Sequence, residues 1–439
     1  MDVSESNSRV GMHDFPGLKE FGVSSGADRG WHVMADVLYK LNGTSLYKVL
    51  ANGTYTSLGS VPGSGRAVFA DDGSNLLFVT GGVLYKYDGS TVSTITQTVV
   101  SGVISVAFIN SQFIITGADA IFAVSDPGDP DTWNALNFAQ EETSPDGLLR
   151  AYVFSQLVYM VGNKTVVPWY NSGVGNPPFD RQDTSLVNIG GGGTHAVTNT
   201  DQFMYLFGDD RKFYQVIGAS SRNITTSAVA HIVEAFDTVS DCILSSFIFE
   251  GQDFVLASFP SAGKTLCFSE PNNYWVELSS GTDEPGDRWY GNSVISCYGK
   301  TLVADYRNGN VYELDGDTYT DAGDTRLRIR TLAPITGSMI GSPGRRITHS
   351  HTRIEMQCGV GLATGQGSNP VLMCQTSNDG GHTWGSEEHV PMGVMGDYVR
   401  AVDFFQFCTG YEIRIKIKCS DPVFLSMWGA TAFVTDGGY

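Results

Sequence analysis

The sequence predicts an all-β protein in which a β-propeller, with seven blades or alternatively six, is followed by a C-terminal β-sandwich-like domain. The main observation is a strand triplet that recurs seven times at intervals of 35 to 50 residues. Repeats of this length, each forming one small antiparallel sheet, are typical of propellers, because a blade buries its faces only by stacking on its neighbours. The first strand of each triplet begins near Trp31, Arg66, Ile104, Ala151, His195, Ile243 and Ser293.

The propeller is expected to fill residues 31–323, after a polar N-terminal extension at 1–30 that contains a turn at Phe15–Leu18. Helical periodicity is confined to Ser227–Phe236. Asn-Gly and Asp-Gly pairs fit tight hairpins between strands. Long connections, which in repeat proteins map to one face and often to the binding face, interrupt the blades at 126–147, 171–193, 218–242 and 279–291.

The amino-acid composition of the chain changes near Asp324. Residues 325–354 contain six arginines and neither Asp nor Glu. Arginines alternate with apolar residues from Arg326 to Arg330, which predicts a half-buried strand with a basic outer face. Residues 324–439 are therefore expected to form a separate sandwich-like domain. Its strands are expected near 326–333, 346–356, 371–377, 398–407, 411–418 and 423–434.

The arginines suggest a docking surface in this otherwise acidic protein. Arg326, Arg328, Arg330, Arg345 and Arg346 could bind an acidic partner or another copy of the chain. The alternative interpretation is a solvated sheet face with no partner.

Charge and cysteine content narrow the class of protein. With 27 basic and 46 acidic residues, the formal net charge of −19 argues against a general nucleic-acid binder and favours a surface that repels phosphate. Seven scattered cysteines without a CxxC pair indicate buried, reduced thiols and folding in a reducing compartment. The polar N-terminus and the lack of an apolar run of about 18 residues predict neither a signal peptide nor a transmembrane helix.

One segment matches the Asp-box pattern, S-x-D-x-G-x-T-W. It places Ser377, Asp379, Gly381 and Trp384 in a turn, where the carboxylate accepts backbone amides and the glycine supplies positive φ. The pattern recurs on several blades of sialidases, but here it occurs once and outside the predicted propeller. It therefore predicts a structural hairpin rather than a catalytic site.

Catalytic and ligand sites are not expected. A glycosidase needs two carboxylates flanking the scissile bond, and no such pair stands out. Arg66, Arg150, Arg211 and Tyr170 could serve a sialidase-like site, but nothing in the sequence selects them. Gly263–Thr265 resembles the end of a P-loop without its first glycine, and His349 and His351 lack a third metal ligand. The chain is expected to be non-enzymatic and without a cofactor.

Several short segments, in order along the chain, resemble the tail hub proteins of short-tailed phages, which are also called packaged-DNA stabilisation proteins. The clearest is Asp126–Trp133 followed by Phe138–Glu141 and Ser144–Gly147, which is similar to that family's "Pro-Asp-x-[Trp/Tyr]…Phe-Ala-x-Ala-Glu…Pro-Asp" stretch, with Glu141 in place of the second Ala. The other matching segments are Phe15–Leu18, Leu157–Val166, Ser377–Glu387, Arg414–Lys418 and Ser420–Val423.

This resemblance implies a structural virion protein. Such hubs form a hexameric ring below the portal and its adaptor ring, carry tailspikes, fibres or needle proteins, retain packaged DNA and form part of the ejection channel. They are assembled in the host bacterial cytoplasm and reside in the virion tail. An acidic lumen would let DNA pass without sticking. The competing hypothesis is a glycan-binding or glycan-cleaving propeller of the sialidase type.

Overall fold

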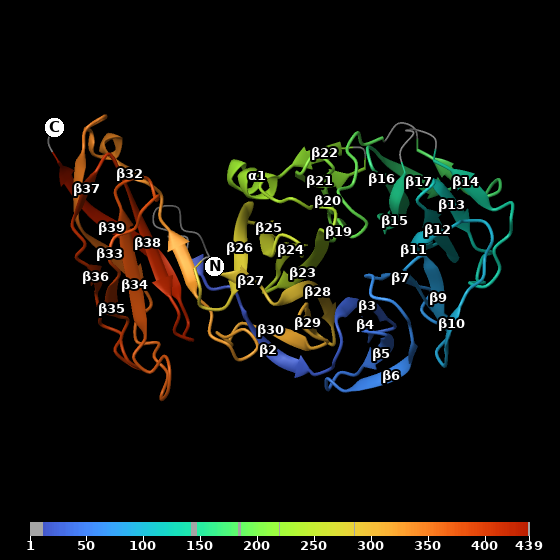
Figure 1. Ribbon diagram of the computed structural model, residues 1–439, viewed down its shortest axis with the longest axis horizontal. Coiled ribbons are helices and arrows are strands. Elements are labelled where there is room, and N and C mark those ends of the chain that lie inside the picture. The colour runs from blue at the N-terminus through green and yellow to red at the C-terminus, as the bar shows by residue number, and fades with distance from the viewer. Residues whose placement is uncertain (1–11, 142–146, 183–185, 219, 285, 438–439) are drawn as a thin grey trace. The chain divides into compact units, whose positions relative to one another are not determined.

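The computed structural model describes residues 12–141, 147–182, 186–218, 220–284 and 286–437 (Figure 1). These residues group into two compact units. The propeller unit comprises Glu20–Leu278 and Arg288–Leu314, and the sandwich unit comprises the described residues of 1–19, 279–287 and 315–439. The sequence predicts domain boundaries after residues 30 and 323. That the segments between these boundaries are independent domains remains a prediction.

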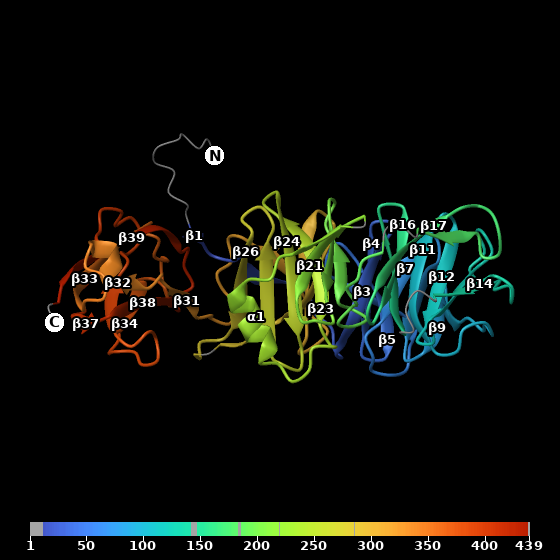
Figure 2. The same cartoon turned by 90° about the horizontal axis from the view of Figure 1, so that it is seen from above.

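In the described part of the propeller unit the strands form seven antiparallel sheets arranged radially about one axis (Figure 1), and Figure 2 shows the same blades edge-on. The predicted seven-bladed propeller is confirmed. The first four blades are β3 (Asp28–Met34), β4 (Val37–Asn42), β5 (Ser45–Val49), β6 (Tyr55–Ser60); β7 (Val68–Asp71), β8 (Leu76–Thr80), β9 (Val83–Tyr87), β10 (Val92–Thr94); β11 (Val103–Ile109), β12 (Gln112–Gly117), β13 (Ile121–Val124), β14 (Phe138–Gln140); and β15 (Leu148–Phe154), β16 (Leu157–Gly162), β17 (Val166–Asn171), β18 (Phe179–Arg181).

The last three blades include one strand from near the N-terminus. β2 (Gly17–Gly22) is the outermost strand of the seventh blade, in the order β2-β30-β29-β28, so the two ends of the propeller sequence meet in one sheet. This corrects the expectation that residues 1–30 are irregular. The other strands are β19 (Val197–Asn199), β20 (Met204–Phe207), β21 (Phe213–Ile217), β22 (Ser220–Asn223); β23 (Ile243–Phe249), β24 (Gln252–Phe259), β25 (Lys264–Ser269), β26 (Tyr274–Ser280), β27 (Asp287–Arg288); and β28 (Gly291–Cys297), β29 (Lys300–Asp305), β30 (Val311–Asp315).

Blade stacking follows from the two-residue period of a strand. Every residue of β8 is buried. Leu76 and Phe78 pack in a cluster with side chains of the first blade, whereas Leu77 and Val79 pack in a cluster with side chains of the third. Because both faces of an inner strand are covered, each blade depends on the one before and the one after it.

Tight turns join the first two strands of most blades. In five blades the two connecting residues both have positive φ, which is the type I′ geometry that matches strand twist. Only two of these turns contain glycine, so the Asn-Gly and Asp-Gly pairs seen in the sequence do not form them. The turn residues are Ala35-Asp36, Asn110-Ser111, Ser155-Gln156, Glu250-Gly251 and Tyr298-Gly299.

One helix, α1 (Ser227–Glu234), lies in the described part of the chain, close to where helical periodicity predicts it. Thr226 caps its N-terminus, because its side chain accepts from the amide of Val229. Val229 and Val233 are buried on its inner face.

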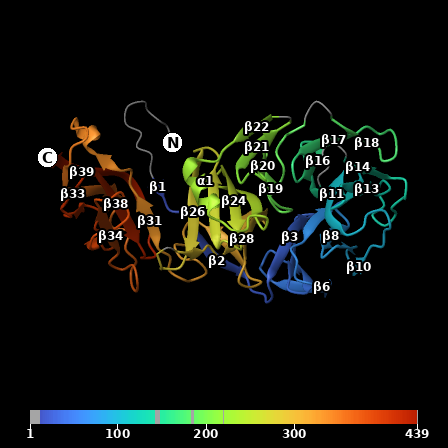
Figure 3. The ribbon, with the colours of Figure 1, turned by 45° about the horizontal axis from the view of Figure 1, so that its top comes forward.

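The sandwich unit consists of two sheets whose inner faces share one apolar core (Figure 3). Ile354, Phe404 and Met427 enter this core from one sheet, and Leu372 and Ile415 enter it from the other. The predicted sandwich-like fold is confirmed. Its strands are β1 (Met12–His13), β33 (Ile347–Met356), β36 (Val402–Phe404), β37 (Cys408–Gly410) and β39 (Ser426–Asp436), against β31 (Arg328–Thr331), β32 (Ile335–Thr336), β34 (Val371–Ser377), β35 (Glu388–Pro391) and β38 (Glu412–Cys419), with a 3-10 turn at Gly337–Ile340.

Candidate functional site

The arginine-rich segment does not form the exposed stripe that the sequence predicts. Arg326 and Arg328 are only 6% and 8% exposed, so their side chains point into the sandwich unit rather than to solvent. The expectation that these two arginines form an assembly surface is therefore wrong. Alternation identifies the two faces of a strand, but it does not say which face is buried when the polar side chains have buried partners.

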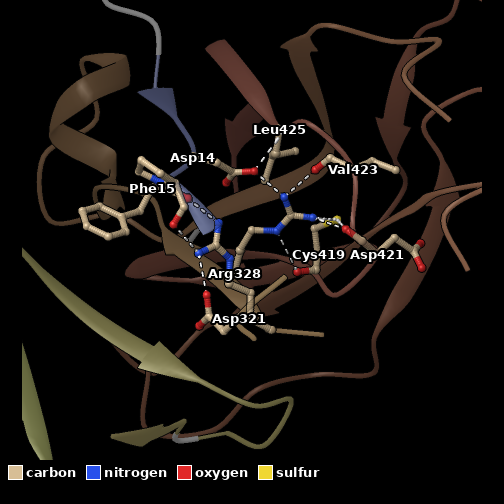
Figure 4. Close-up of polar contacts among 10 residues, drawn as sticks. Asp14, Phe15, Asp321, Arg328, Cys419, Asp421, Val423 and Leu425 are labelled. Atoms are coloured by element: carbon tan, nitrogen blue, oxygen red, sulfur yellow. Dashed lines mark hydrogen bonds and ion pairs between the residues drawn. The ribbon is translucent and has the colours of Figure 1, made fainter. Parts of the chain in front are cut away.

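Arg328 is held by a carboxylate and by backbone carbonyls (Figure 4). Its guanidinium donates to Asp14, to the carbonyl of Asp421 and to the carbonyl of Val423 (2.6 Å). Asp14 also accepts from the backbone amide of Leu425 (3.1 Å). A fork of five N–H donors explains why arginine fits this position, since lysine could not reach all of these acceptors.

Arg326 has a matching environment. Its guanidinium donates to Asp321 (3.2 Å) and to the carbonyls of Phe15 and Pro16, the latter at 2.9 Å. Asp321 is fully buried and also accepts from the hydroxyl of Ser280 (2.7 Å). Together the two arginines fasten the Asp14–Pro16 segment into the sandwich unit.

The other arginines of the predicted assembly surface remain accessible. Arg330 is half-buried and donates to the carbonyl of Ile329 (2.8 Å). Arg345 pairs with Asp436 (3.1 Å) at the surface, and Arg346 is exposed. A role in assembly for Arg330, Arg345 and Arg346 stays a proposal.

The Asp-box segment forms a closed network of hydrogen bonds between β34 and β35. Ser377 donates to Asp379 (2.7 Å) and accepts from the amide of Gly381 (2.9 Å). Asp379 accepts from both the amide (2.9 Å) and the hydroxyl (2.6 Å) of Thr383. Gly381 has φ of +96°, where a side chain would be strained. These contacts support the proposal that the four predicted residues form a structural hairpin.

Trp384 closes the hairpin on its other side, but it is half-buried rather than fully packed. The ammonium group of Lys416 lies 3.9 Å from the centroid of its ring, a cation–π contact. Lys416 in turn pairs with Glu284 (2.5 Å), and this hydrogen bond is the main reason that the pKa of Glu284 is lowered.

Replacement of Asp379 by alanine is expected to lower the melting temperature of the sandwich unit, because three donors of the turn lose their acceptor. Hydrogen bonds from Thr383 and Ser377 hold the pKa of Asp379 well below its usual range. The contribution of Asp379 is thus present at neutral pH and is lost only as the pH falls through that depressed pKa. His382→Ala, at an exposed position of the same turn, is the control for melting curves. If both variants have the same melting temperature as the parent, the turn does not need the carboxylate.

The sandwich unit also carries a group of exposed and half-buried aromatic side chains that we call the aromatic patch. It is defined as the exposed Phe405, Phe407 and Phe433 with the half-buried Trp384 and His351. Phe405 and Phe407 are 69% and 75% exposed, and they line a groove of about 600 Å³ with Trp384. His351 stacks on Phe433 (3.8 Å between ring centroids) and on Phe405 (5.5 Å). Contiguous exposed apolar surface of this kind marks an interaction site.

Polar side chains line the same groove. The Gln406 amide donates to the carbonyls of Cys374 (2.8 Å) and Ser386 (2.9 Å). The Oε2 atom of Glu388 and the Oε1 atom of Gln406 are buried and accept no hydrogen bond from any described residue. The sequence contains a signal for the patch, because Phe405 and Phe407 alternate with the buried Phe404. Alternation alone, however, cannot say which of these aromatic residues face outward.

The propeller channel contains two of the residues that a sialidase-like site would recruit. Arg66 and Arg150 line a cavity of about 480 Å³ on the inner strands, together with His195. Arg211 instead donates to the carbonyl of Phe236 (2.9 Å) just beyond α1, and Tyr170 is exposed on β17. The structure therefore brings two of the four together and places the other two elsewhere in the propeller unit.

Acidic groups of the same cavity lie apart from the arginines. His195 precedes strand β19 and Asp201 follows it, so the chain between them spans up to roughly 20 Å at about 3.3 Å per residue. Burial lowers the pKa of His195, and the charges of Arg66 and Arg150 lower it further. At the other end, burial raises the pKa of Asp253, and the charge of Asp201 raises it further. The cavity thus has a basic end and an acidic end, not one catalytic centre.

The histidines and cysteines of the described residues form no metal site. Within the described ranges no cluster of three His, Cys, Asp or Glu side chains could hold a metal ion. His349 is buried between the hydroxyl of Thr352 and the carbonyl of Gln406, each at 2.7 Å, while His351 belongs to the aromatic patch. Of the helices that the structure describes, none is long and apolar enough to cross a membrane. All seven cysteines are free, and all but Cys408 are buried.

The chain is similar to several solved structures at low sequence identity. The WD40 β-propeller domain of Doa1 is 13% identical, with a TM-score of 0.45, and the match covers 68% of this chain and 97% of that one. BamB from Moraxella catarrhalis is 10% identical (TM-score 0.42; 70% and 97% covered), and the computationally designed Ika8 protein is 8% identical (0.42; 68% and 99%). No curated protein matches the chain.

A family comparison identifies the chain. Residues 3–319, which include the whole propeller unit, match the family described as "Bacteriophage P22 Gp10, beta-propeller". Of the segments that suggested phage tail hubs, Ser144–Asp146 lie outside the described residues, while Asp126–Trp133 lead into β14 and Leu157–Val166 span β16 and the start of β17. The chain belongs to the bacteriophage P22 Gp10 family of β-propeller proteins, and it is a structural protein of a phage virion.

Proposed function

We propose that the chain is the tail hub, or nozzle, subunit of a short-tailed phage. In this role it forms a ring, which the family resemblance implies is a hexamer. The ring attaches below the portal and adaptor ring and carries tailspikes, fibres or needle proteins. The ring retains packaged DNA and forms part of the ejection channel. The observation that carries the proposal is membership of the P22 Gp10 family across the whole propeller unit.

Three features of the molecule support this role. The net charge of −19 disfavours adhesion to DNA phosphates, as a conduit for DNA requires. The aromatic patch offers apolar surface for a neighbouring subunit. The family to which the chain belongs is one of phage structural proteins, which favours a non-enzymatic role.

We assign the aromatic patch to the contact between copies of this chain in the ring. Its exposed rings lie together on one unit, and self-association would cover them. Free, buried cysteines suit assembly in the reducing cytoplasm of a host bacterium. We also propose that Arg330, Arg345 and Arg346 contact acidic neighbours in the assembly.

Sedimentation of the purified chain tests this assignment. The parent is expected to sediment as a ring, at a multiple of its 47.3 kDa mass, and the double variant Phe405→Ser/Phe407→Ser as a monomer with an unchanged melting temperature. The control is Leu136→Ser/Val174→Ser, which removes equally exposed apolar side chains from the propeller unit. A ring that persists in the patch variant, or that is lost in the control, contradicts the assignment.

A further inference from the structure

The basic end of the propeller channel contains a guanidinium without a counter-charge. Arg150 is half-buried on β15, and within the described chain it forms no ion pair with a carboxylate. Its single hydrogen bond, to the carbonyl of Thr194, is long at 3.5 Å. Its Nε atom is buried and has no partner, and its charge lies 5.2 Å from the ring of Tyr152. A half-buried guanidinium without a carboxylate partner keeps donors that can bind an acceptor from outside the chain.

Of the neighbouring groups, Arg66 adds positive charge, whereas His195 and Ser293 are neutral hydrogen-bonding groups. Arg66 lines the same cavity and pairs with Asp28 (3.1 Å), but Asp28 is already shared with Lys40. His195 faces both arginines, and burial followed by these two charges lowers its pKa well below the ordinary value. The hydroxyl of Ser293, on the same cavity wall, is also buried without a partner.

These donors match the chemistry of an oxyanion. A guanidinium presents parallel N–H groups that bind phosphate, sulfate or carboxylate in bidentate fashion, and such charge-assisted hydrogen bonds are stronger than neutral ones. The cavity volume of about 480 Å³ is within the range of small-molecule sites, so the oxyanion could be part of a larger molecule. The acidic end near Asp201 and Asp253 would direct an anion toward the arginines.

We propose that the basic end of the propeller channel is a binding site for a small oxyanion, with Arg150 as its principal ligand and Arg66, His195 and Ser293 as its surroundings. This site lies within the propeller unit and does not depend on ring formation. It gives a phage structural protein a ligand site separate from its assembly contacts.

Isothermal titration of the purified chain tests the site with three probes, inorganic phosphate, sulfate and glucuronate, at constant ionic strength set with chloride. The parent is expected to bind at least one probe with a stoichiometry of one per chain. Tighter binding of phosphate or sulfate indicates a phosphate- or sulfate-bearing ligand, and tighter binding of glucuronate indicates an acidic sugar. Failure of all three probes to bind the parent overturns the proposal.

Variants locate the binding to Arg150. Arg150→Gln is expected to weaken binding by about tenfold or more, and Arg150→Lys, which keeps the charge but loses the fork, by less. The control Arg222→Gln removes an exposed arginine of β22 and is expected to leave affinity unchanged. If Arg150→Gln does not fold, the affinity of Arg150→Lys for the probe, compared with that of the parent, tests whether Arg150 is a ligand. Parental affinity in whichever Arg150 variants fold, or equal loss in the control, contradicts the assigned ligand.

Discussion

Replacement of Asp28 by asparagine is expected to lower the free energy of unfolding of the propeller unit by about 3–5 kcal/mol. Asp28 and Lys40 are both 0% exposed, and Asp28 also accepts from Arg66 (3.1 Å) and from the side chain of Asn292 (2.8 Å). The asparagine leaves two buried or half-buried cations without their carboxylate. Because Asp28 comes from the first blade and Asn292 from the seventh, the loss falls on the closure of the propeller. Urea unfolding followed by tryptophan fluorescence measures it.

Two further variants separate the charge effect from simple loss of a contact. Asp28→Asn/Lys40→Met removes both charges and is expected to recover part of the lost stability. Asp131→Asn, which breaks a surface pair with Lys86 (2.5 Å), is expected to cost at most about 1 kcal/mol. The account fails here if Asp28→Asn is no more destabilising than Asp131→Asn.

The same carboxylate makes stability depend on pH. Burial would raise the pKa of Asp28, but Lys40 and Arg66 outweigh it and lower the pKa to about 2, from an ordinary value of 3.8. A depressed folded-state pKa contributes stability that is present above the unfolded pKa and lost as the pH falls through the folded one. The difference in stability between the parent and Asp28→Asn should therefore be constant near neutral pH and shrink between about pH 4 and pH 2.

Replacement of Arg328 by methionine is expected to destabilise the sandwich unit by about 3–5 kcal/mol. Methionine preserves much of the buried volume, but it leaves Asp14 as an unpaired carboxylate and removes the donors to the carbonyls of Asp421 and Val423. Hydrogen exchange reports on each unit by itself and is therefore the suitable readout. Protection of β38 amides should fall while that of β8 amides stays.

Arg330→Met is the matched control for Arg328, two residues along the same strand. Its side chain is half-buried and donates only to its neighbouring carbonyl, so a change below about 1 kcal/mol is expected. Equal losses of protection in the two variants would mean that the buried network around Arg328 does not stabilise the unit.

The repeat architecture could be predicted because each blade obeys a local rule. Strand alternation, turn residues and the six intervals between the seven triplets can be seen in the sequence itself. They place β3, β7, β11, β15, β19, β23 and β28 within a few residues of where they lie. Closure of the propeller by β2, the outermost strand of the seventh blade, could not be predicted this way. Its pairing with β30 joins residues far apart in the sequence, and Phe15–Leu18 looks like a turn until its partner strand is known.

The arginines show a different limit. Arg326 and Arg328 read as an outer face because charge is usually solvated, yet Asp14 and Asp321 lie where they can pair with them. Phe405 and Phe407 are the reverse case, because apolar side chains are usually buried and yet both are exposed. In each case a partner decides which face is buried, and that partner lies elsewhere in the chain or outside it.

The central claim, that this chain is part of a phage tail, is tested most directly by electron microscopy of purified virions labelled with gold-conjugated antibody against the native chain. The account predicts gold at the tail, below the portal vertex, on most particles. Gold that is absent from intact virions, or that is distributed over the capsid, would contradict it.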